Sequence, residues 1–490
     1  MHWFDAESRA WLSRARGSQR WRGWKADCSD CVETTERAHW VPWPGGVCDE
    51  SEAPFVRWYC GGLTNAAFNE VCSALPRASA CLAALSPRCP SVLLATAAQL
   101  DRHVIAGHGR ETAFVFEPGG DAPPSRIGRR ELLIHSVVAA ATLRDGLGLC
   151  AGRRVGIVLP SHPAAVVWIS ACKRLGLTFV AIAAGTSSDA LADRLVDARV
   201  DAVVTSEALL PSVNVACAAL AEMPARLAVP LSDDAPGRAF AAADDTAGGS
   251  GSGADEGGVL RASRLLSRSR AQLIRLAGDD SRLEGLSDAA LVALLWRLVP
   301  PVPVDASWPL FILYTSGSTG QPKGIVHTHG GYQVGLCATA REVLGIRPAA
   351  DVLLVVATPG WITGQSYMIA AALLCRVASV LLAGSPVDPP TRFASVIATH
   401  RVSVLKAGST FLRMLMTLPD AAALLAAHDL SSLRLGCFCA EPVNEEVHRF
   451  ATRHLTRNYI NAYWATEVRR APQRPPRLAC PGAPRALCPS

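Results

Sequence analysis

A run of hydroxyl-bearing residues and glycines lies between an apolar segment and a lysine, and this is the composition of a phosphate-binding loop. The run reads Tyr314-Thr315-Ser316-Gly317-Ser318-Thr319-Gly320-Gln321-Pro322-Lys323. Glycines let backbone N–H groups approach a ligand closely, and hydroxyls and a lysine bind phosphate oxygens. The apolar residues 309–313 predict a short buried strand that ends at the loop. Open α/β sheets place ligand sites at such strand ends.

The loop is not a Walker A motif, because Lys323 stands between Pro322 and Gly324 where that motif requires Gly-Lys-Ser/Thr. It resembles the signature loop of the adenylate-forming (AMP-binding) enzymes. The continuation, residues 324–332 with the sequence GIVHTHGGY, is similar to the acetyl-CoA synthetase branch. The alternative is a glycine- and serine-rich surface turn. The resemblance implies that the loop binds the β- and γ-phosphates of ATP and that Thr319 and Lys323 have catalytic roles. The implied binding residues are Thr315, Ser316, Gly317, Ser318, Thr319 and Gly320.

Two later segments resemble the nucleotide motifs of the same family. Asn461-Ala462-Tyr463-Trp464-Ala465-Thr466-Glu467 is similar to the family's Asp-Thr-Trp-Trp-Gln-Thr-Glu. The resemblance implies that Tyr463 stacks on adenine, that Thr466 bonds the α-phosphate, and that Glu467 is catalytic and holds Mg²⁺. Ala440-Glu441-Pro442 is similar to a Gly-Glu-Pro whose backbone lies near the nucleotide. The alternative for the first segment is an aromatic strand end that faces the core.

A fourth segment resembles the acyl pocket of acetyl-CoA synthetases. It is Gly360-Trp361-Ile362-Thr363-Gly364-Gln365-Ser366-Tyr367, similar to the family's Gly-Trp-Val/Ile-Thr-Gly-His-Ser-Tyr. The resemblance implies a pocket for a two- or three-carbon acid, because a wall indole excludes longer chains by sterics. The implied pocket residues are Trp361, Ile362, Thr363, Cys439 and Trp464. The alternative is ordinary core packing of the two tryptophans.

The chain also departs from the family pattern. Thr358-Pro359 replaces an Asp-Val, Gln321 replaces a lysine, and Ala208-Leu209-Leu210-Pro211 stands where an arginine pair that grips CoA is expected. Thr363 is therefore the single CoA contact that the resemblance carries over. The family continues after the magnesium glutamate with a ribose-binding segment and a mobile C-terminal domain that bears a catalytic lysine. These are not recognised after Glu467, so the sequence is interpreted as truncated before that domain.

Composition narrows the class of protein. Of the 490 residues, 50% are hydrophobic and 18% are charged, which predicts a globular chain. The net charge of +6 is scattered, and without a basic stripe nucleic acid is not an expected partner. The 16 cysteines show no ordered spacing, which favours reduced thiols in the cytoplasm. Residues 352–375 carry no charge, but Pro359, Gly360 and Gly364 interrupt them, so we expect a buried strand and helix there and no membrane span.

Alternating strand and helix patterns predict an α/β fold with two subdomains and mostly parallel sheets. We expect strands over residues 155–159, 178–182 and 202–205 and helices over 164–175 and 190–200. The expected division is an irregular segment 1–55, a first α/β unit 56–210 with an insertion at 72–99, an irregular linker-rich region 211–300, a second α/β unit 301–467 with the nucleotide motifs, and a disordered Pro/Arg-rich tail 468–490.

The resemblance implies an AMP-forming acetate–CoA ligase. Its small-molecule substrates would be ATP, with Mg²⁺, acetate or a similar short acid, and CoA. One alternative is propionate or 3-hydroxypropionate as the acid. Another is a catalytically impaired, nucleotide-binding remnant, because the ribose contact and the C-terminal lysine are not recognised. Oligomeric state is left open by the sequence.

Overall fold

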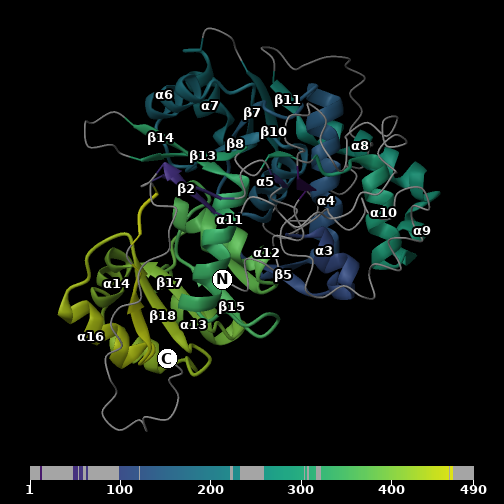
Figure 1. Ribbon diagram of the computed structural model, residues 1–490. Coiled ribbons are helices and arrows are strands. Elements are labelled where there is room, and N and C mark those ends of the chain that lie inside the picture. The colour runs from purple at the N-terminus through teal and green to yellow at the C-terminus, as the bar shows by residue number, and fades with distance from the viewer. Residues whose placement is uncertain are drawn as a thin grey trace.

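The protein is built on two seven-stranded, mostly parallel β-sheets (Figure 1), which confirms the predicted α/β class. This computed structural model describes residues 99–120, 122–220, 224–231, 259–302, 304–305, 308–315, 322–462 and 464–466, together with four short strands before residue 99. Those four strands form part of two small antiparallel sheets. One consists of β1 (Leu12–Ser13), β4 (Gly62–Thr64) and β12 (Val304–Asp305), and the other of β2 (Cys48–Glu52) and β3 (Phe55–Trp58).

The first large sheet comes mainly from residues 154–328. Its order is β11 (Val259–Arg261), β10 (Ala225–Val229), β9 (Ala202–Ser206), β7 (Arg154–Val158), β8 (Thr178–Ile182), β13 (Pro309–Thr315) and β14 (Lys323–Thr328). All neighbours are parallel except β13 and β14, which form an antiparallel hairpin at one edge. The strands predicted over 178–182 and 309–313 are therefore confirmed.

The second large sheet comes mainly from residues 352–461. Its order is β19 (Tyr459–Asn461), β18 (Leu435–Cys439), β17 (Val404–Gly408), β15 (Val352–Val355), β16 (Ala378–Leu382), β5 (Thr112–Glu117) and β6 (Ser125–Gly128). Only the edge strand β6 is antiparallel. β5 and β6 come from the first predicted α/β unit, and β13 and β14 of the other sheet come from the second. Each sheet therefore draws strands from both halves of the sequence.

A layer of helices lies between the two sheets. It contains α4 (Arg129–Ala141), α5 (Pro163–Leu175), α11 (His329–Ala338), the π-helical η8 (Gly364–Ala371) and α12 (Ala372–Leu374). One hydrophobic cluster includes residues from these helices and from both sheets. Every residue of α5 and η8 is buried, which explains their nearly continuous apolar sequences. Figure 1 shows α11 and α5 between β8 and β13 of the first sheet and β5 and β15 of the second.

Other helices cover the two outer faces. α6 (Ser188–Ala198) and α7 (Leu210–Cys217) pack on the first sheet through a second cluster. α13 (Arg392–His400), α14 (Ser409–Met416), α15 (Ala421–Ala426) and α16 (Glu445–His454) pack on the second sheet through a third. The described part of the chain thus has a helix–sheet–helix–sheet–helix layering. The short helical segments are α3 (Asp101–His103), η3 (Val104–His108), η4 (Thr142–Gly146), η5 (Glu207–Leu209) and η7 (Thr339–Val343).

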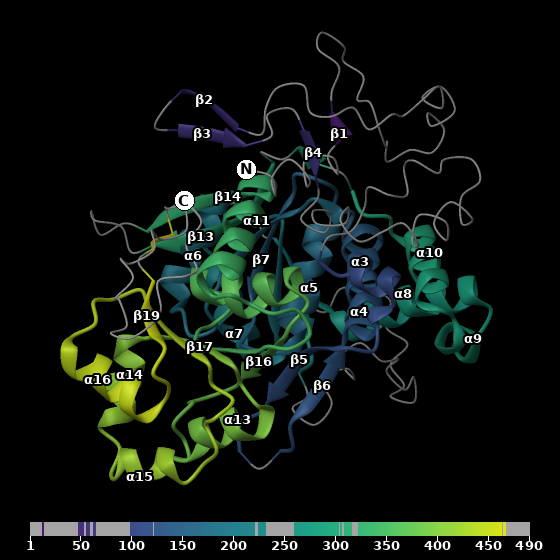
Figure 2. The same ribbon diagram turned by 60° about the horizontal axis from the view of Figure 1, so that its bottom comes forward.

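Residues 211–300 differ from the predicted irregular region. Their described part contains β10, β11 and three helices, α8 (Ala262–Ala277), α9 (Asp280–Gly285) and α10 (Asp288–Leu298), which lie beside α4 at one end of the molecule (Figures 1 and 2). Leu266 and Leu273 of α8 are buried seven residues apart, so this helix has an apolar stripe that its many arginines and serines obscure in the sequence.

No helix in the described ranges is long and apolar enough to cross a membrane. The uncharged stretch 352–375 forms β15, a loop, η8 and α12, as its proline and glycines predict.

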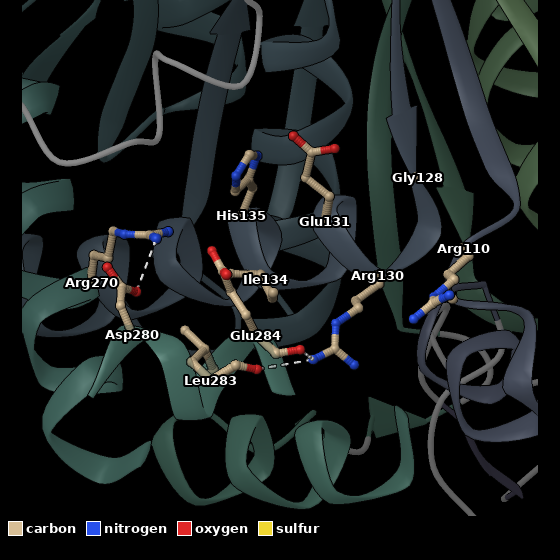
Figure 3. Close-up of a pocket in the computed structure, with 11 residues that line it drawn as sticks. Arg110, Gly128, Arg130, Glu131, Ile134, His135, Arg270, Asp280, Leu283 and Glu284 are labelled. Carbon is tan, nitrogen blue, oxygen red and sulfur yellow. Dashed lines mark hydrogen bonds and ion pairs between the residues drawn. The ribbon is translucent and has the colours of Figure 1, made fainter. Parts of the chain in front are cut away.

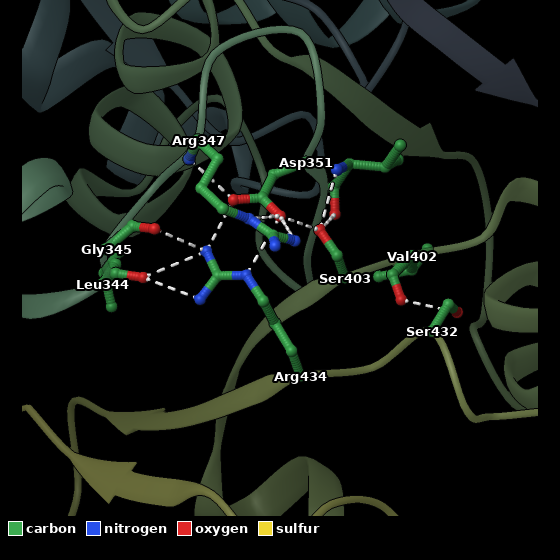
Figure 4. A network of polar contacts seen from close by, with 9 residues as sticks. Leu344, Gly345, Arg347, Asp351, Val402, Ser403, Ser432 and Arg434 are labelled. Atoms are coloured by element: carbon green, nitrogen blue, oxygen red, sulfur yellow. Dashed lines mark hydrogen bonds and ion pairs between the residues drawn. The ribbon is translucent and has the colours of Figure 1, made fainter.

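A buried carboxylate ties together the amino-terminal ends of three strands of the second sheet (Figure 4). Asp351, which precedes β15, is 2% exposed. Its oxygens accept hydrogen bonds from Arg434 Nε (3.0 Å), from the backbone N of Arg347 (2.7 Å) and from Ser403 Oγ (2.8 Å). Ser403 and Arg434 immediately precede β17 and β18. This network lies at the edge of the sheet opposite to the strand ends described next.

Candidate functional site

The carboxyl ends of strands in the second sheet bring three predicted segments to one edge. β18 ends at Cys439 and continues into Ala440, and β19 ends at Asn461, with Trp464 three residues later. The paired residues Gly408 and Cys439, and Phe438 and Asn461, fix the register. The loop after β15 contains the predicted pocket residues 361–363. Because parallel strands end together, this edge is where the fold places a ligand site.

The predicted phosphate loop connects β13 and β14, the antiparallel hairpin at the edge of the first sheet. Thr315 and Lys323 are paired across these strands, so Lys323 lies opposite the end of β13. Among the described residues, the buried Thr315 Oγ1 has no hydrogen-bond partner. A buried, unpaired hydroxyl fits an anionic ligand that it could contact. Ser316, Gly317, Ser318, Thr319 and Gly320 lie outside the described residues, as do Tyr463 and Glu467.

A continuous chain of contacts joins the hairpin to Trp464. The Phe311 ring on β13 meets the Tyr332 ring edge-on, with centroids 4.9 Å apart. Tyr332 Oη donates to Ser366 Oγ at 3.0 Å. The neighbouring residue Tyr367 packs edge-on against Trp464 with centroids 5.3 Å apart. The strand that leads into the proposed phosphate loop and the proposed pocket wall are therefore linked through one path of contacts.

Three of the predicted pocket residues are buried. Ile362, Thr363 and Cys439 are almost fully buried. Burial raises the pKa of the Cys439 thiol, although the neighbouring Lys406 opposes this shift, so the thiol stays protonated at neutral pH. Trp464 is half-buried against the central core. Trp361 is 37% exposed and is less buried than the other four. The pocket roles of all five residues stay predictions.

The loop that carries Ile362 and Thr363 is held tightly. Gln365 Nε2 donates to the Pro359 carbonyl at 2.5 Å, and the backbone N of Gln365 donates to Trp361 O at 3.0 Å. At Gly360 an added Cβ would lie 2.2 Å from the backbone N of Ala183, just past the end of β8. Only glycine fits this contact. The pocket loop therefore packs directly on the first sheet.

The residues after β18 have a structural role that the sequence did not predict. Glu441 accepts hydrogen bonds from Ser409 Oγ (3.1 Å) and the backbone N of Thr410 (3.0 Å), at the start of α14, and forms an ion pair with Arg413 at 3.2 Å. Burial alone would raise the pKa of Glu441, but these hydrogen bonds lower it below its ordinary value. The carboxylate satisfies free N–H groups at the helix start and holds the loop in place.

The remaining residues of these motifs line the same edge. Ala462 is buried and its N–H donates to the Phe438 carbonyl at 3.0 Å. Asn461 and Ala465 are exposed and Thr466 is half-buried. Pro442 accepts a hydrogen bond from Ser409 Oγ at 2.9 Å. In the described part of the chain no group of three or more His, Cys, Asp or Glu could hold a metal ion.

Ala440 has a backbone conformation that favours glycine. Its φ is +73°, which costs a residue with a Cβ roughly 1–2 kcal/mol. We expect Ala440→Gly to raise the free energy of unfolding by about 1 kcal/mol, after the greater freedom of glycine in the unfolded chain is subtracted. Thermal unfolding of the two proteins checks this, and a lower midpoint for the glycine variant would contradict the argument.

A cavity of about 490 Å³ lies elsewhere, between α4, α8 and α9. Figure 3 shows its lining, which includes His135 and Glu131 from α4 and the ion pair of Arg270 with Asp280 at 3.3 Å. Burial lowers the pKa of His135 to about 4, so this histidine is neutral at pH 7. None of the lining residues belongs to the predicted site.

Two residues at the site were not predicted, Tyr367 as a support for Trp464 and Lys406 on β17. Lys406 is almost fully buried, and its Nζ lies 4.4 Å from the Tyr367 ring centroid. One signal was available in the sequence, because a single lysine interrupts the apolar run 402–408. A buried lysine in a strand needs a partner.

Comparison with known proteins gives the same family. The model of the AMP-binding enzyme family matches residues 101–471. Among curated relatives, the acetyl-coenzyme A synthetase of Mycobacterium bovis is 31% identical over 94% of this chain and 61% of its own length. The enzyme of the same name from Mycolicibacterium smegmatis is 32% identical over 86% of this chain and 38% of its own length. The acetyl-coenzyme A synthetase of Streptomyces avermitilis is 30% identical over 89% of this chain and 58% of its own length.

The chain thus spans 61% or less of the length of these three relatives. The family match covers both large sheets and every predicted site motif. On this evidence the chain belongs to the AMP-binding enzyme family.

Proposed function

We propose that this chain activates a two- or three-carbon carboxylic acid, with acetate as the first candidate, by reaction with ATP and passes the acyl group to CoA. A carboxylate oxygen attacks the α-phosphorus, pyrophosphate leaves, and an acyl-adenylate forms. The CoA sulfur then attacks the acyl carbon and AMP leaves. Such chemistry depends mainly on positioning and charge stabilisation.

One observation carries the proposal. The buried residues Ile362, Thr363 and Cys439 and the indole of Trp464 belong to segments at the carboxyl edge of the second sheet. Trp464 is connected through Tyr367, Ser366 and Tyr332 to Phe311 of β13, the strand that leads into the proposed phosphate loop. A short acid would place its alkyl end against the indole of Trp464 and its carboxylate toward the proposed ATP site. The alkyl chain of a longer acid would collide with the indole.

The other roles follow from the family resemblance. Residues 315–320 and Lys323 would bind the triphosphate, Tyr463 would stack on adenine, and Thr466 would bond the α-phosphate. Glu467 would hold the Mg²⁺ ion, which neutralises phosphate charge when bound. Thr363 would contact CoA. We also place the protein in the cytoplasm, a proposal supported by the free thiols of the seven cysteines described between residues 99 and 466.

ATP–pyrophosphate exchange tests the proposal. We expect exchange that requires acetate or propionate, and a rate about 10-fold or more lower in Lys323→Ala, because a positive charge at the base of the phosphate loop is lost. Octanoate serves as the control acid that the indole should exclude.

Acetate-dependent exchange equal in the wild type and Lys323→Ala would contradict the role of the loop. No exchange with any acid, while ATP still binds, would contradict the ligase and support a nucleotide-binding remnant.

A further inference from the structure

Lys406 is a buried cation close to the proposed acyl pocket. It lies in β17 and is 2% exposed. Its neighbour across the sheet is Cys437, whose Sγ accepts a hydrogen bond from Lys406 Nζ at 3.3 Å. Within the described residues, no carboxylate forms an ion pair with it. A thiol is a weak acceptor, so this bond alone compensates little of the cost of burying the ammonium.

Two aromatic rings supply the remaining stabilisation. Lys406 Nζ lies 4.4 Å from the centroid of the Tyr367 ring and 5.8 Å from that of Trp464. Both distances are within the range at which a cation is attracted to a ring face, and the attraction is stronger where water is excluded. The two rings themselves pack edge-on. The ammonium, the phenol and the indole therefore form one cluster, which we name the Lys406 cluster.

The contacts of Lys406 favour its charged form. Burial alone would lower the pKa of the ammonium, but its surroundings outweigh this effect and the pKa lies above its ordinary value. The hydrogen bond to Cys437 and the two ring contacts are interactions that stabilise an ammonium.

The cluster is placed to act on the pocket wall. Lys406 lies two residues before Gly408, and Cys437 two residues before Cys439 on the adjacent strand. Residues two apart in a strand face the same side of a sheet. The Lys406–Cys437 pair therefore lies on the same side of the sheet as the Gly408–Cys439 pair, two residues further from the carboxyl ends of the strands. The ammonium contacts the half-buried indole of Trp464, the proposed pocket wall.

We infer that Lys406 is a positioning residue for the acyl pocket, because its ammonium holds the Tyr367 and Trp464 rings in the orientation that limits the length of the acid. This inference rests on the proposed function. It names Lys406 as the residue that keeps Trp464 in the position where the indole limits the length of the acid. A methionine at this position would fill similar space without the desolvation cost, so packing alone does not require the charge.

Acid selectivity in Lys406→Met is the first test. We measure kcat/KM for acetate and for butyrate in the wild type, in Lys406→Met and in the matched control Lys173→Met. Lys173 is also buried, with a hydrogen bond to Gln99 at 3.0 Å and a ring contact of 5.9 Å to Phe179. We expect the ratio of acetate to butyrate to fall about 10-fold in Lys406→Met and to stay unchanged in Lys173→Met. An unchanged ratio in Lys406→Met would overturn the inference.

A second measurement needs no activity. In protein labelled with 5-fluorotryptophan, the ¹⁹F resonance of Trp464 is identified by its loss in Trp464→Phe. We expect one resonance in the wild type and a shifted, broadened or split resonance in Lys406→Met, with no change in Lys173→Met. An identical Trp464 resonance in the wild type and in Lys406→Met would show that the ammonium does not hold the indole.

The two tests separate the failure of this inference from that of the proposed function. If the wild type shows no exchange with any acid, the ligase proposal fails, and the fluorine spectrum alone decides the role of Lys406. If exchange is normal but neither selectivity nor the spectrum changes, the role of Lys406 fails and the ligase stands. Lys406→Gln, which keeps a polar end without the charge, replaces Lys406→Met if the latter does not fold.

Discussion

We expect Asp351→Asn to lower the free energy of unfolding by about 3 kcal/mol. The carboxylate of Asp351 is buried, and it receives hydrogen bonds from Arg434, Arg347 and Ser403 (Figure 4). An asparagine removes the negative charge and turns one acceptor into a donor that faces two guanidinium groups. This loss is at the low end for a broken buried ion pair, because Arg347 is largely exposed and solvent screens part of its interaction.

The pH dependence of stability should change with this substitution. Burial raises the pKa of Asp351, but hydrogen bonds from Arg434, Arg347 and Ser403 outweigh it, and the pKa lies well below its ordinary value. The contribution of this group is therefore present above the unfolded-state pKa of about 3.9 and is lost as the pH falls toward the folded-state pKa. We expect Asp351→Asn to be less sensitive than the wild type to acid below about pH 4.

Asp429→Asn is the matched control for Asp351→Asn. Asp429 forms an ion pair with Arg401 at 2.6 Å, and both side chains are more than half exposed, so little stability should be lost. Equal losses in the two variants, measured by denaturant unfolding, would contradict the structural role of the buried carboxylate.

Gly360→Ala is expected to disrupt both stability and acid activation. The new methyl group would lie 2.2 Å from the backbone N and 2.6 Å from the Cα of Ala183. Backbone atoms cannot turn aside as a flexible side chain can, so the pocket loop must separate from the end of β8. Overpacking of this kind costs about 3 kcal/mol, and displacement of Ile362 and Thr363 should reduce acetate-dependent exchange about 100-fold.

Gly185→Ala is the control for Gly360→Ala. Gly185 follows β8 closely, but an added Cβ there meets nothing within 4 Å. We expect this variant to keep the wild-type midpoint of thermal unfolding and its exchange rate. A Gly360→Ala protein with both quantities unchanged would show that the loop does not pack on β8 as described.

The local sequence patterns were sufficient to predict the central strands and the helix between them. The strand 178–182 was predicted with the bounds of β8, and the helix 164–175 differs from α5 by one residue at its start, because continuous apolar runs bounded by glycine and proline are typical of buried elements. The exchange of strands between the two sheets was not predicted. Pairing of β5 with β16 joins residues about 265 positions apart, and no local pattern encodes such a contact.

The site was predicted from motifs, and its supports were not. Cys439, Asn461 and Trp464 were proposed because the resemblance names them, and the parallel pairing of β18 with β19 explains why the ends of these two strands lie side by side. Lys406 and Asp351 were missed, because a charged residue becomes informative only when its burial and partners are known. The left-handed backbone of Ala440 was likewise hidden, although the glycine at this position in the family motif pointed to it.

Transfer of oxygen from acid to AMP is the most direct test of the central claim, that a short acid attacks the α-phosphorus of ATP in this chain. The full chain is incubated with ATP, Mg²⁺, [¹⁸O₂]acetate and hydroxylamine, which traps the activated acyl group. The account predicts acetohydroxamate together with AMP that carries one ¹⁸O atom, since the carbon–oxygen bond of the acyl-adenylate is broken. The absence of labelled AMP, or label in inorganic phosphate instead, would contradict it.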